Sequence, residues 1–127
     1  MNPIPYLIVF LGSGIGGALR HGVNQFIADG LGIKSFPLGI LLINISGSLL
    51  LGFLAGYFAF KGEASQHWRL FLTVGICGGY TTFSTFSQDA ALMIERGQLS
   101  AAALYITASV VASILAFFVG MWVMRQL

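Results

Sequence analysis

Four long apolar segments, separated by short polar connections, occupy nearly all of this 127-residue chain. They run over residues 6–27, 36–60, 68–94 and 99–124. Each is long enough to cross about 30 Å of hydrocarbon at a helical rise of about 1.5 Å per residue. Because a lipid-exposed backbone must satisfy its own hydrogen bonds, such segments cross a membrane as helices. The sequence therefore predicts an all-α integral membrane protein with one four-helix domain over residues 1–127.

The composition excludes several other classes of protein. The chain is 57% hydrophobic and only 8% charged, so little is left for a soluble domain. The first apolar segment has no basic residue ahead of it and is longer than the apolar core of a signal peptide. We therefore expect that it is not cleaved. Cys77 is the only cysteine, which excludes an internal disulfide and leaves a packing role. The six basic residues are dispersed, so nucleic acid is not expected as a partner.

The distribution of basic residues predicts a weakly determined orientation in the membrane. Lys61, Arg69 and Arg125 fall on one side of the expected four-helix arrangement, and Lys34 and Arg96 fall on the other. Since retained positive charges favour the cytoplasm, three against two is a small bias, and the chain is expected to insert both ways round. Four helices with many polar groups at membrane depth also need a partner surface. Both arguments predict an antiparallel, dual-topology homodimer.

The first span carries small residues and one cation on a single helical stripe. Gly12 and Gly16 form a small-xxx-small face for close helix packing, as Gly52 and Gly56 do on the second span. Arg20 continues the stripe of Gly12 and Gly16. A charge at this depth either ties helices together and snorkels, or attracts anions at a pore mouth, and the sequence favours neither alternative.

Polar side chains recur at helical spacing on the second and fourth spans. Asn44 either makes an interhelical hydrogen bond or directs an amide donor into a polar conduit, and taken alone the first role is favoured. Tyr105, Ser109 and Ser113 lie at i, i+4 and i+8 and predict a ladder of hydroxyls along one stripe. Isolated serines usually bond back to the carbonyl four residues earlier, but a continuous ladder would offer successive donors to an anion.

The third span contains the stretch GGYTTFSTF, residues 78–86, which is poorly suited to a continuous helix. Gly78 and Gly79 each weaken a helix by about 1 kcal/mol relative to alanine, and the hydroxyl residues that follow are also poor helix formers. We therefore expect a break in mid-membrane, where free carbonyls would have to meet protein, water or a hard cation. Phe83 and Phe86 follow; packing is the safer role for each alone, although their positive ring edges could face an anion.

Together these residues indicate an anion path and not a proton relay, because the acidic residues lie at or near the span ends. No catalytic set is present, since His21 and His67 lack a nucleophile or metal ligands nearby in sequence. The chain is therefore not expected to be an enzyme.

The motif GGYTTFSTF in the third span, NISGSLLLGFLAG in the second and GxxxR from Gly16 to Arg20 in the first resemble the Fluc/CrcB family of bacterial fluoride ion channels. The resemblance covers essentially the whole chain. It implies a dual-topology antiparallel homodimer with two fluoride pores, each using residues of both subunits. It also implies passive export of cytoplasmic fluoride across the bacterial inner membrane, as a multi-pass protein.

The resemblance further implies roles for individual residues. Phe83 and Phe86 would contact fluoride through their ring edges, and Asn44 would be the pore donor. The polar track along the fourth helix would be Tyr105, Ser109 and Ser113. A structural Na⁺ at the dimer centre would be held by the backbone carbonyls of Gly78 and Thr81 from both subunits.

Two other functions remain open from the sequence. A small dual-topology drug exporter also has four spans, but it needs a membrane-embedded acid in its first span, and residues 6–27 contain none. A membrane scaffold subunit with no transport role would use every polar group above as helix contacts. Fluoride release from liposomes separates both from a channel.

Overall fold

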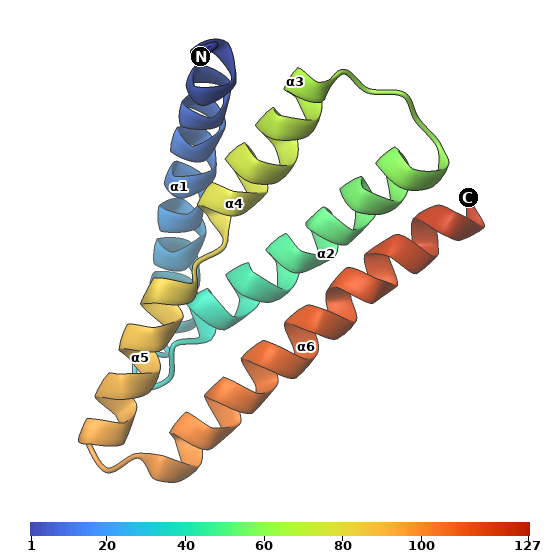
Figure 1. Cartoon of the computed structure of the whole chain (residues 1–127). Coiled ribbons are helices and arrows are strands. Elements are labelled where there is room, and N and C mark those ends of the chain that lie inside the picture. The colour runs from blue at the N-terminus through green and yellow to red at the C-terminus, as the bar shows by residue number, and fades with distance from the viewer.

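A computed structural model describes all 127 residues as helices joined by short loops (Figure 1). The elements are α1 (Ile4–Leu31), α2 (Leu38–Phe60), α3 (Gln66–Arg69), the π-helix η1 (Leu70–Cys77), α4 (Gly78–Tyr80), α5 (Phe83–Glu95) and α6 (Leu99–Gln126). Three of these, α1, α2 and α6, are long and apolar enough to cross a membrane as single helices. The remaining apolar segment is bent and divided among α3, η1, α4 and α5. The predicted all-α membrane class is confirmed.

Local sequence signals account for some of the helix ends. The side chain of Asn2 accepts a hydrogen bond from the Ile4 amide at 3.0 Å at the start of α1. Gly32 ends that helix with a φ of 66°, and Gly97 adopts a φ of 77° between α5 and α6. Only glycine takes such left-handed angles without strain. These two turns reverse the direction of the chain between α1 and α2 and between α5 and α6.

The predicted break in the third span is present, but it lies beyond the two glycines. Gly78 keeps helical angles, and α4 continues to Tyr80. The chain becomes extended at Thr81, with φ −83° and ψ 159°, and at Thr82, with φ −152° and ψ 124°. Gly79 packs against the backbone of Ser13 in α1, whereas Gly78 is exposed and has no close neighbour outside its own helix. The π-helical winding of η1, ahead of the break, was not predicted from the sequence.

The glycine stripes pack where the sequence predicted helix contact. A methyl group on Gly12 would lie 2.8 Å from the Cα of Gly75 in η1. On α2, Gly52 and Gly56 face the backbone of α6 in the same way. Figure 1 shows the result: α1 runs beside η1 and α4, while α2 runs beside α6. The predicted packing role of these glycines is confirmed.

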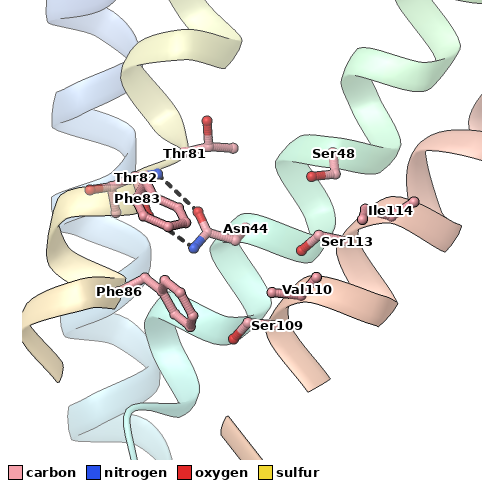
Figure 2. A pocket seen from close by; sticks show the side chains of 10 residues that line it. All are labelled: Asn44, Ser48, Thr81, Thr82, Phe83, Phe86, Ser109, Val110, Ser113 and Ile114. Carbon is pink, nitrogen blue, oxygen red and sulfur yellow. Dashed lines mark hydrogen bonds between the residues drawn. The ribbon is translucent and has the colours of Figure 1, made fainter. Parts of the chain in front are cut away.

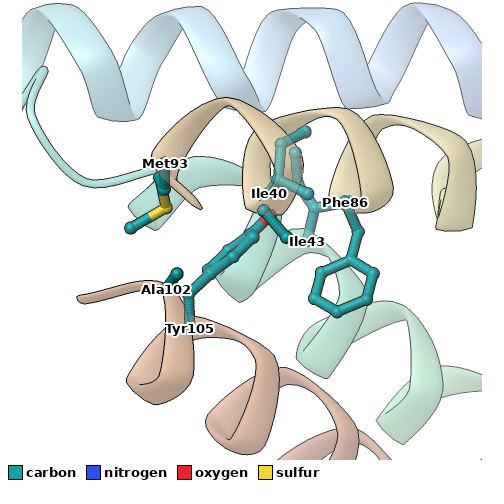
Figure 3. Packing of buried hydrophobic residues seen from close by; sticks show 7 residues of the cluster. Ile40, Ile43, Phe86, Met93, Ala102 and Tyr105 are labelled. Carbon is teal, nitrogen blue, oxygen red and sulfur yellow. The ribbon is translucent and has the colours of Figure 1, made fainter. Parts of the chain in front are cut away.

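The largest buried cluster lies where α5 meets α2 and α6. It consists of Ile40, Ile43, Phe86, Ala90, Met93, Ala102 and Tyr105 (Figure 3). Few residues of the isolated chain are buried: the total is 18 of 127, this cluster included, and large apolar residues such as Phe26, Phe118 and Trp122 are exposed. An apolar outer surface of this extent suits contact with lipid or with another membrane subunit.

Candidate functional site

A cavity of ≈ 320 Å³ lies between α2, the break in the third span, α5 and α6. Its lining is uncharged: Asn44, Ser48, Thr81, Thr82, Phe83, Phe86, Ser109, Val110, Ser113 and Ile114 (Figure 2). The structure thus brings together five of the six predicted pore residues from three different elements. Thr82, Val110 and Ile114 were not predicted to line the pore. The spacing of the second span places Ser48 on the same face as Asn44, but Ser48 was not assigned to the pore.

The side chain of Asn44 makes two hydrogen bonds to the backbone at the break. Its Oδ1 accepts a hydrogen bond from the Thr82 amide at 2.9 Å, and its Nδ2 donates to the Thr82 carbonyl at 3.1 Å. In a continuous helix the Thr82 amide would instead donate to the carbonyl of Gly78. The amide group of Asn44 therefore replaces helical hydrogen bonds at the break, in addition to lining the cavity (Figure 2).

Thr82 also begins α5. Its hydroxyl oxygen accepts a hydrogen bond from the Thr85 amide at 3.1 Å, which is the geometry of a helix N-cap. The same hydroxyl lies 3.2 Å from the Ser84 hydroxyl and 3.3 Å from the Thr85 hydroxyl. A threonine immediately ahead of a helical pattern is a recognisable cap signal, so this role could have been found from the sequence. The N-terminus of a 13-residue helix therefore lies at the cavity.

Phe83 and Phe86 lie next to each other on α5. Their ring centroids are 5.3 Å apart with an interplanar angle of 57°. The two rings differ in environment, because Phe86 is 7% exposed and Phe83 is 75% exposed. Phe86 belongs to the buried cluster of the chain, whereas Phe83 extends from the open side of the cavity. A ring this exposed at membrane depth needs lipid or a second protein surface to cover it.

Two serines of α6 supply hydroxyl groups to the cavity. The Oγ atoms of Ser109 and Ser113 are buried and make no hydrogen bond within the chain. They do not bond back to the carbonyls one turn earlier, which is the usual arrangement for serine in a helix. Since a buried polar group without a partner is costly, both hydroxyls are available to an occupant of the cavity.

Tyr105 does not continue this ladder into the cavity, although it was predicted to. Its side chain is fully buried, and its hydroxyl donates to Oδ2 of Asp89 at 3.1 Å. The ring of Tyr105 instead supports Phe86, with centroids 5.2 Å apart. Helical spacing placed Tyr105 on the correct stripe, but the approach of α5 directs its hydroxyl to a carboxylate on that helix. Asp89 was not identified as its partner from the sequence.

Arg20 lies in a second cavity, separate from the first. This cavity has a volume of ≈ 230 Å³ and is lined by Gly17, Arg20, His21, Asn24, Ile40 and Thr85. A hydrogen bond between the Thr82 and Thr85 hydroxyls joins the linings of the two cavities, since Thr82 lines the first cavity and Thr85 lines the second. The structure thus places Arg20 at a polar site inside the bundle and apart from Phe83 and Phe86.

The predicted ligands of Na⁺ are two backbone carbonyls at the break, those of Gly78 and Thr81. No cluster of three histidine, cysteine or acidic residues could hold a metal. The Thr81 carbonyl accepts no backbone hydrogen bond, and the amide that would pair with the Gly78 carbonyl is bonded to Asn44. Carbonyl oxygens left without a donor suit a hard monovalent cation. These two groups therefore fit Na⁺ chemically.

Comparison with known proteins gives a consistent result over nearly the whole chain. Residues 7–121 match the sequence profile of the family described as CrcB-like protein, Camphor Resistance (CrcB). The chain is 51% identical over 122 residues to fluoride-specific ion channel FluC 2 of Nitrobacter hamburgensis, covering 96% of this chain and 98% of the relative. It is 57% identical over 120 residues to fluoride-specific ion channel FluC of Methylobacterium nodulans, covering 94% and 95%. A FluC protein of Rhodopseudomonas palustris is 53% identical over 122 residues, covering 96% and 98%.

Proposed function

The chain belongs to the CrcB-like family and is a fluoride-specific ion channel, and we propose that fluoride crosses the membrane through the cavity between α2, α5 and α6. Hydrogen fluoride crosses a bilayer uncharged and dissociates in a near-neutral cytoplasm, where the anion is trapped. A passive channel in the bacterial cytoplasmic membrane lets the negative-inside potential expel it, at about 2.3 kcal/mol per charge per 100 mV. The process needs no covalent chemistry, and the channel is not an enzyme.

The observation that carries this proposal is the lining of the cavity. Ser109 and Ser113 provide buried hydroxyl donors without partners, and no ionised side chain lines the same space. Phe83 and Phe86 add aromatic edges with positive potential, and the N-terminus of α5 adds partial positive charge. A donor-lined site favours a small hard anion, and without a carboxylate or histidine in its lining it provides no proton relay.

We propose that two copies of the chain assemble as an antiparallel homodimer with two such pores. The support is the exposure of Phe83 beside the cavity, together with an apolar outer surface and a small basic bias between the two ends. A second copy of opposite orientation would cover the Phe83 ring. The cavity would then be closed by residues of both subunits.

We also assign a structural Na⁺ to the break, held by the carbonyls of Gly78 and Thr81 from each subunit. The support is that helical hydrogen bonding to both oxygens is lost where Asn44 binds Thr82. Bound between two copies, the cation would stabilise an arrangement in which four carbonyl dipoles converge. Exchange of Na⁺ for a large organic cation should then lower the melting temperature of the purified dimer, whereas the same exchange should leave a monomeric variant unchanged.

Arg20 is assigned to a vestibule that leads to this path. Its guanidinium lies in a polar cavity that approaches the pore cavity only through the Thr82–Thr85 hydroxyl pair. A fixed cation there would raise the local concentration of anions without contacting them in the narrow part.

The decisive experiment is fluoride release from liposomes that contain the purified protein, followed with a fluoride electrode. We expect release that is much faster than from empty liposomes, with no comparable release of chloride. Absence of release above the empty-liposome rate would contradict the channel function. Release that is unchanged by Phe83→Ala and Phe86→Ala, in rate and in preference for fluoride over chloride, would contradict the assigned path and leave the channel standing.

A further inference from the structure

The loop that joins α1 to α2 and the C-terminal end of α5 together enclose a third cavity, of ≈ 120 Å³. Its lining residues are Lys34, Ser35, Pro37, Asp89, Leu92, Met93 and Arg96. Two cations and one carboxylate therefore border one small space, although Lys34 and Arg96 are 62 residues apart in sequence. Both basic side chains are exposed to the surroundings, whereas Asp89 is half-buried.

The other basic residues near the helix ends are placed differently. Arg69 lies over the ring of Phe58 at 5.3 Å, and Arg125 lies over the ring of Phe60 at 4.9 Å. Lys61 follows the end of α2, which packs against the last turns of α6 where Arg125 lies, and it lines none of the cavities described above. Lys34 and Arg96 are thus the pair whose charges converge on a cavity.

A short series of contacts leads from this cavity to the fluoride path. Asp89 lines the cavity, and its Oδ2 accepts the hydrogen bond from Tyr105. The ring of Tyr105 contacts the ring of Phe86, which lines the cavity between α2, α5 and α6. The basic pair therefore lies beyond Tyr105 and Asp89, on the side of Phe86 that is away from the break.

We propose that Lys34 and Arg96 form an outer docking site for a partly hydrated small anion, fluoride in particular, at the mouth of the conduction path. With Asp89 ionised the three charges sum to +1, so the mouth attracts an anion. The carboxylate keeps the site from holding the anion too tightly, because it opposes the two cations at close range. The cavity has room for only a few water molecules, which suits a small ion better than a lipid phosphate with its glycerol.

This inference rests on the proposed fluoride path, and it predicts a specific dependence on ionic strength. Exposed charges attract ions over about 30 Å at 0.01 M salt but over only about 3 Å at 1 M. Docking at Lys34 and Arg96 should therefore speed fluoride entry at low salt and add little at high salt.

The test is fluoride release from neutral liposomes by the full-length channel at both salt concentrations. The variant Lys34→Gln/Arg96→Gln should slow release about threefold at 0.01 M salt. At 1 M salt it should slow release less than about 1.5-fold. Its matched control is Lys61→Gln/Arg125→Gln, which removes the same charge at the opposite end and should leave release unchanged at both. The charge-conserving variant Lys34→Arg/Arg96→Lys should behave as the wild type, which separates charge from loss of folding.

Three results would overturn the docking site. They are equal slowing by the control pair, slowing that does not depend on salt, and no slowing at low salt. Slowing that occurs only in liposomes with anionic lipid would assign the pair to headgroup phosphate and would also overturn it. A wild-type protein that releases no fluoride would instead contradict the proposed function, so the two failures are distinguishable.

Discussion

The seam between α1 and the first half of the third span is packed quite differently from the region between α5 and α6. At the seam, Gly12 and Gly16 of α1 meet Gly75 of η1 and Gly79 of α4, and the backbones touch with no room for a methyl group. Between α5 and α6, small side chains border open space, and the Ser109 and Ser113 hydroxyls have no partner.

Both regions contain small residues, but two phenylalanines also line the cavity, so residue size alone does not decide between a tight contact and open space. The difference comes from the break at Thr81 and Thr82, which redirects the chain after α4. Before the break the third span runs close along α1. After it, α5 approaches α6 at its far end and leaves space near the break, as Figure 1 shows.

The largest effect is expected from filling the tight seam. Gly79→Val would place its Cβ 2.5 Å from the carbonyl oxygen of Ser13, so the two helices would have to separate. We expect loss of the folded, monodisperse protein in detergent, measured by size-exclusion chromatography and thermal melting. The control is Gly14→Val on α1, the other helix of the seam, because a Cβ at Gly14 meets nothing within 4 Å. Equal stability of the two variants would contradict the tight seam.

The two phenylalanines should separate conduction from stability. Phe86→Ala should lower the free energy of unfolding by about 3 kcal/mol because the ring is buried, and it should also slow fluoride release. Phe83→Ala should slow release to a similar degree with a smaller change in melting temperature. The control Phe118→Ala removes an exposed ring of α6 and should leave release unchanged. An unchanged melting temperature for Phe83→Ala would contradict the proposed second copy that covers this ring.

Removal of the two hydrogen bonds between Asn44 and Thr82 should have the next largest effect. Asn44→Ala deletes both hydrogen bonds to Thr82 and should cost about 2 kcal/mol, with fluoride release slowed about tenfold or more. Thermal melting and the liposome assay measure the two effects. Ser48→Ala is the matched control, because Ser48 lines the same cavity and makes no bond to the break. If both variants behave alike, Asn44 acts only as lining.

The smallest effect on stability is expected inside the cavity. Ser113→Ala removes a buried hydroxyl without a partner, so the melting temperature should be unchanged or slightly higher, while fluoride release should slow a few-fold. Ser46→Ala provides the opposite case, because its hydroxyl bonds the Ile43 carbonyl and lies 3.1 Å from the Tyr80 hydroxyl. That variant should melt earlier and conduct normally. Normal conduction by Ser113→Ala would remove this residue from the path.

Much of the fold follows from local rules. The apolar segments, the packing stripes through Gly12, Gly16, Gly52 and Gly56, and the broken third span were all predicted from the sequence, and the structure confirms them. Within the stretch predicted to break, the opening lies at Thr81 and Thr82, where Asn44, 38 residues away, binds Thr82. A propensity argument cannot include a partner so distant in sequence.

The candidate site was also predicted only in part from the sequence. Helical spacing placed Tyr105, Ser109 and Ser113 on one stripe, and the two serines do face the cavity. Tyr105 binds Asp89 instead, because the angle at which α5 meets α6 brings that carboxylate within reach. The convergence of Lys34 and Arg96 on one cavity was not visible either, since it depends on where a loop and a helix end meet.

The sequence by itself determined the membrane class, the order of the helices, the family and the types of side chain available to an anion. The family is indicated by the resemblance of three local motifs, and the other properties depend on composition and on periodicity within single helices. The tertiary structure alone decided which of those side chains share a cavity, which are tied to one another, and where the third span opens. Those outcomes depend on helix crossing angles and on hydrogen bonds between distant residues, which no local pattern contains.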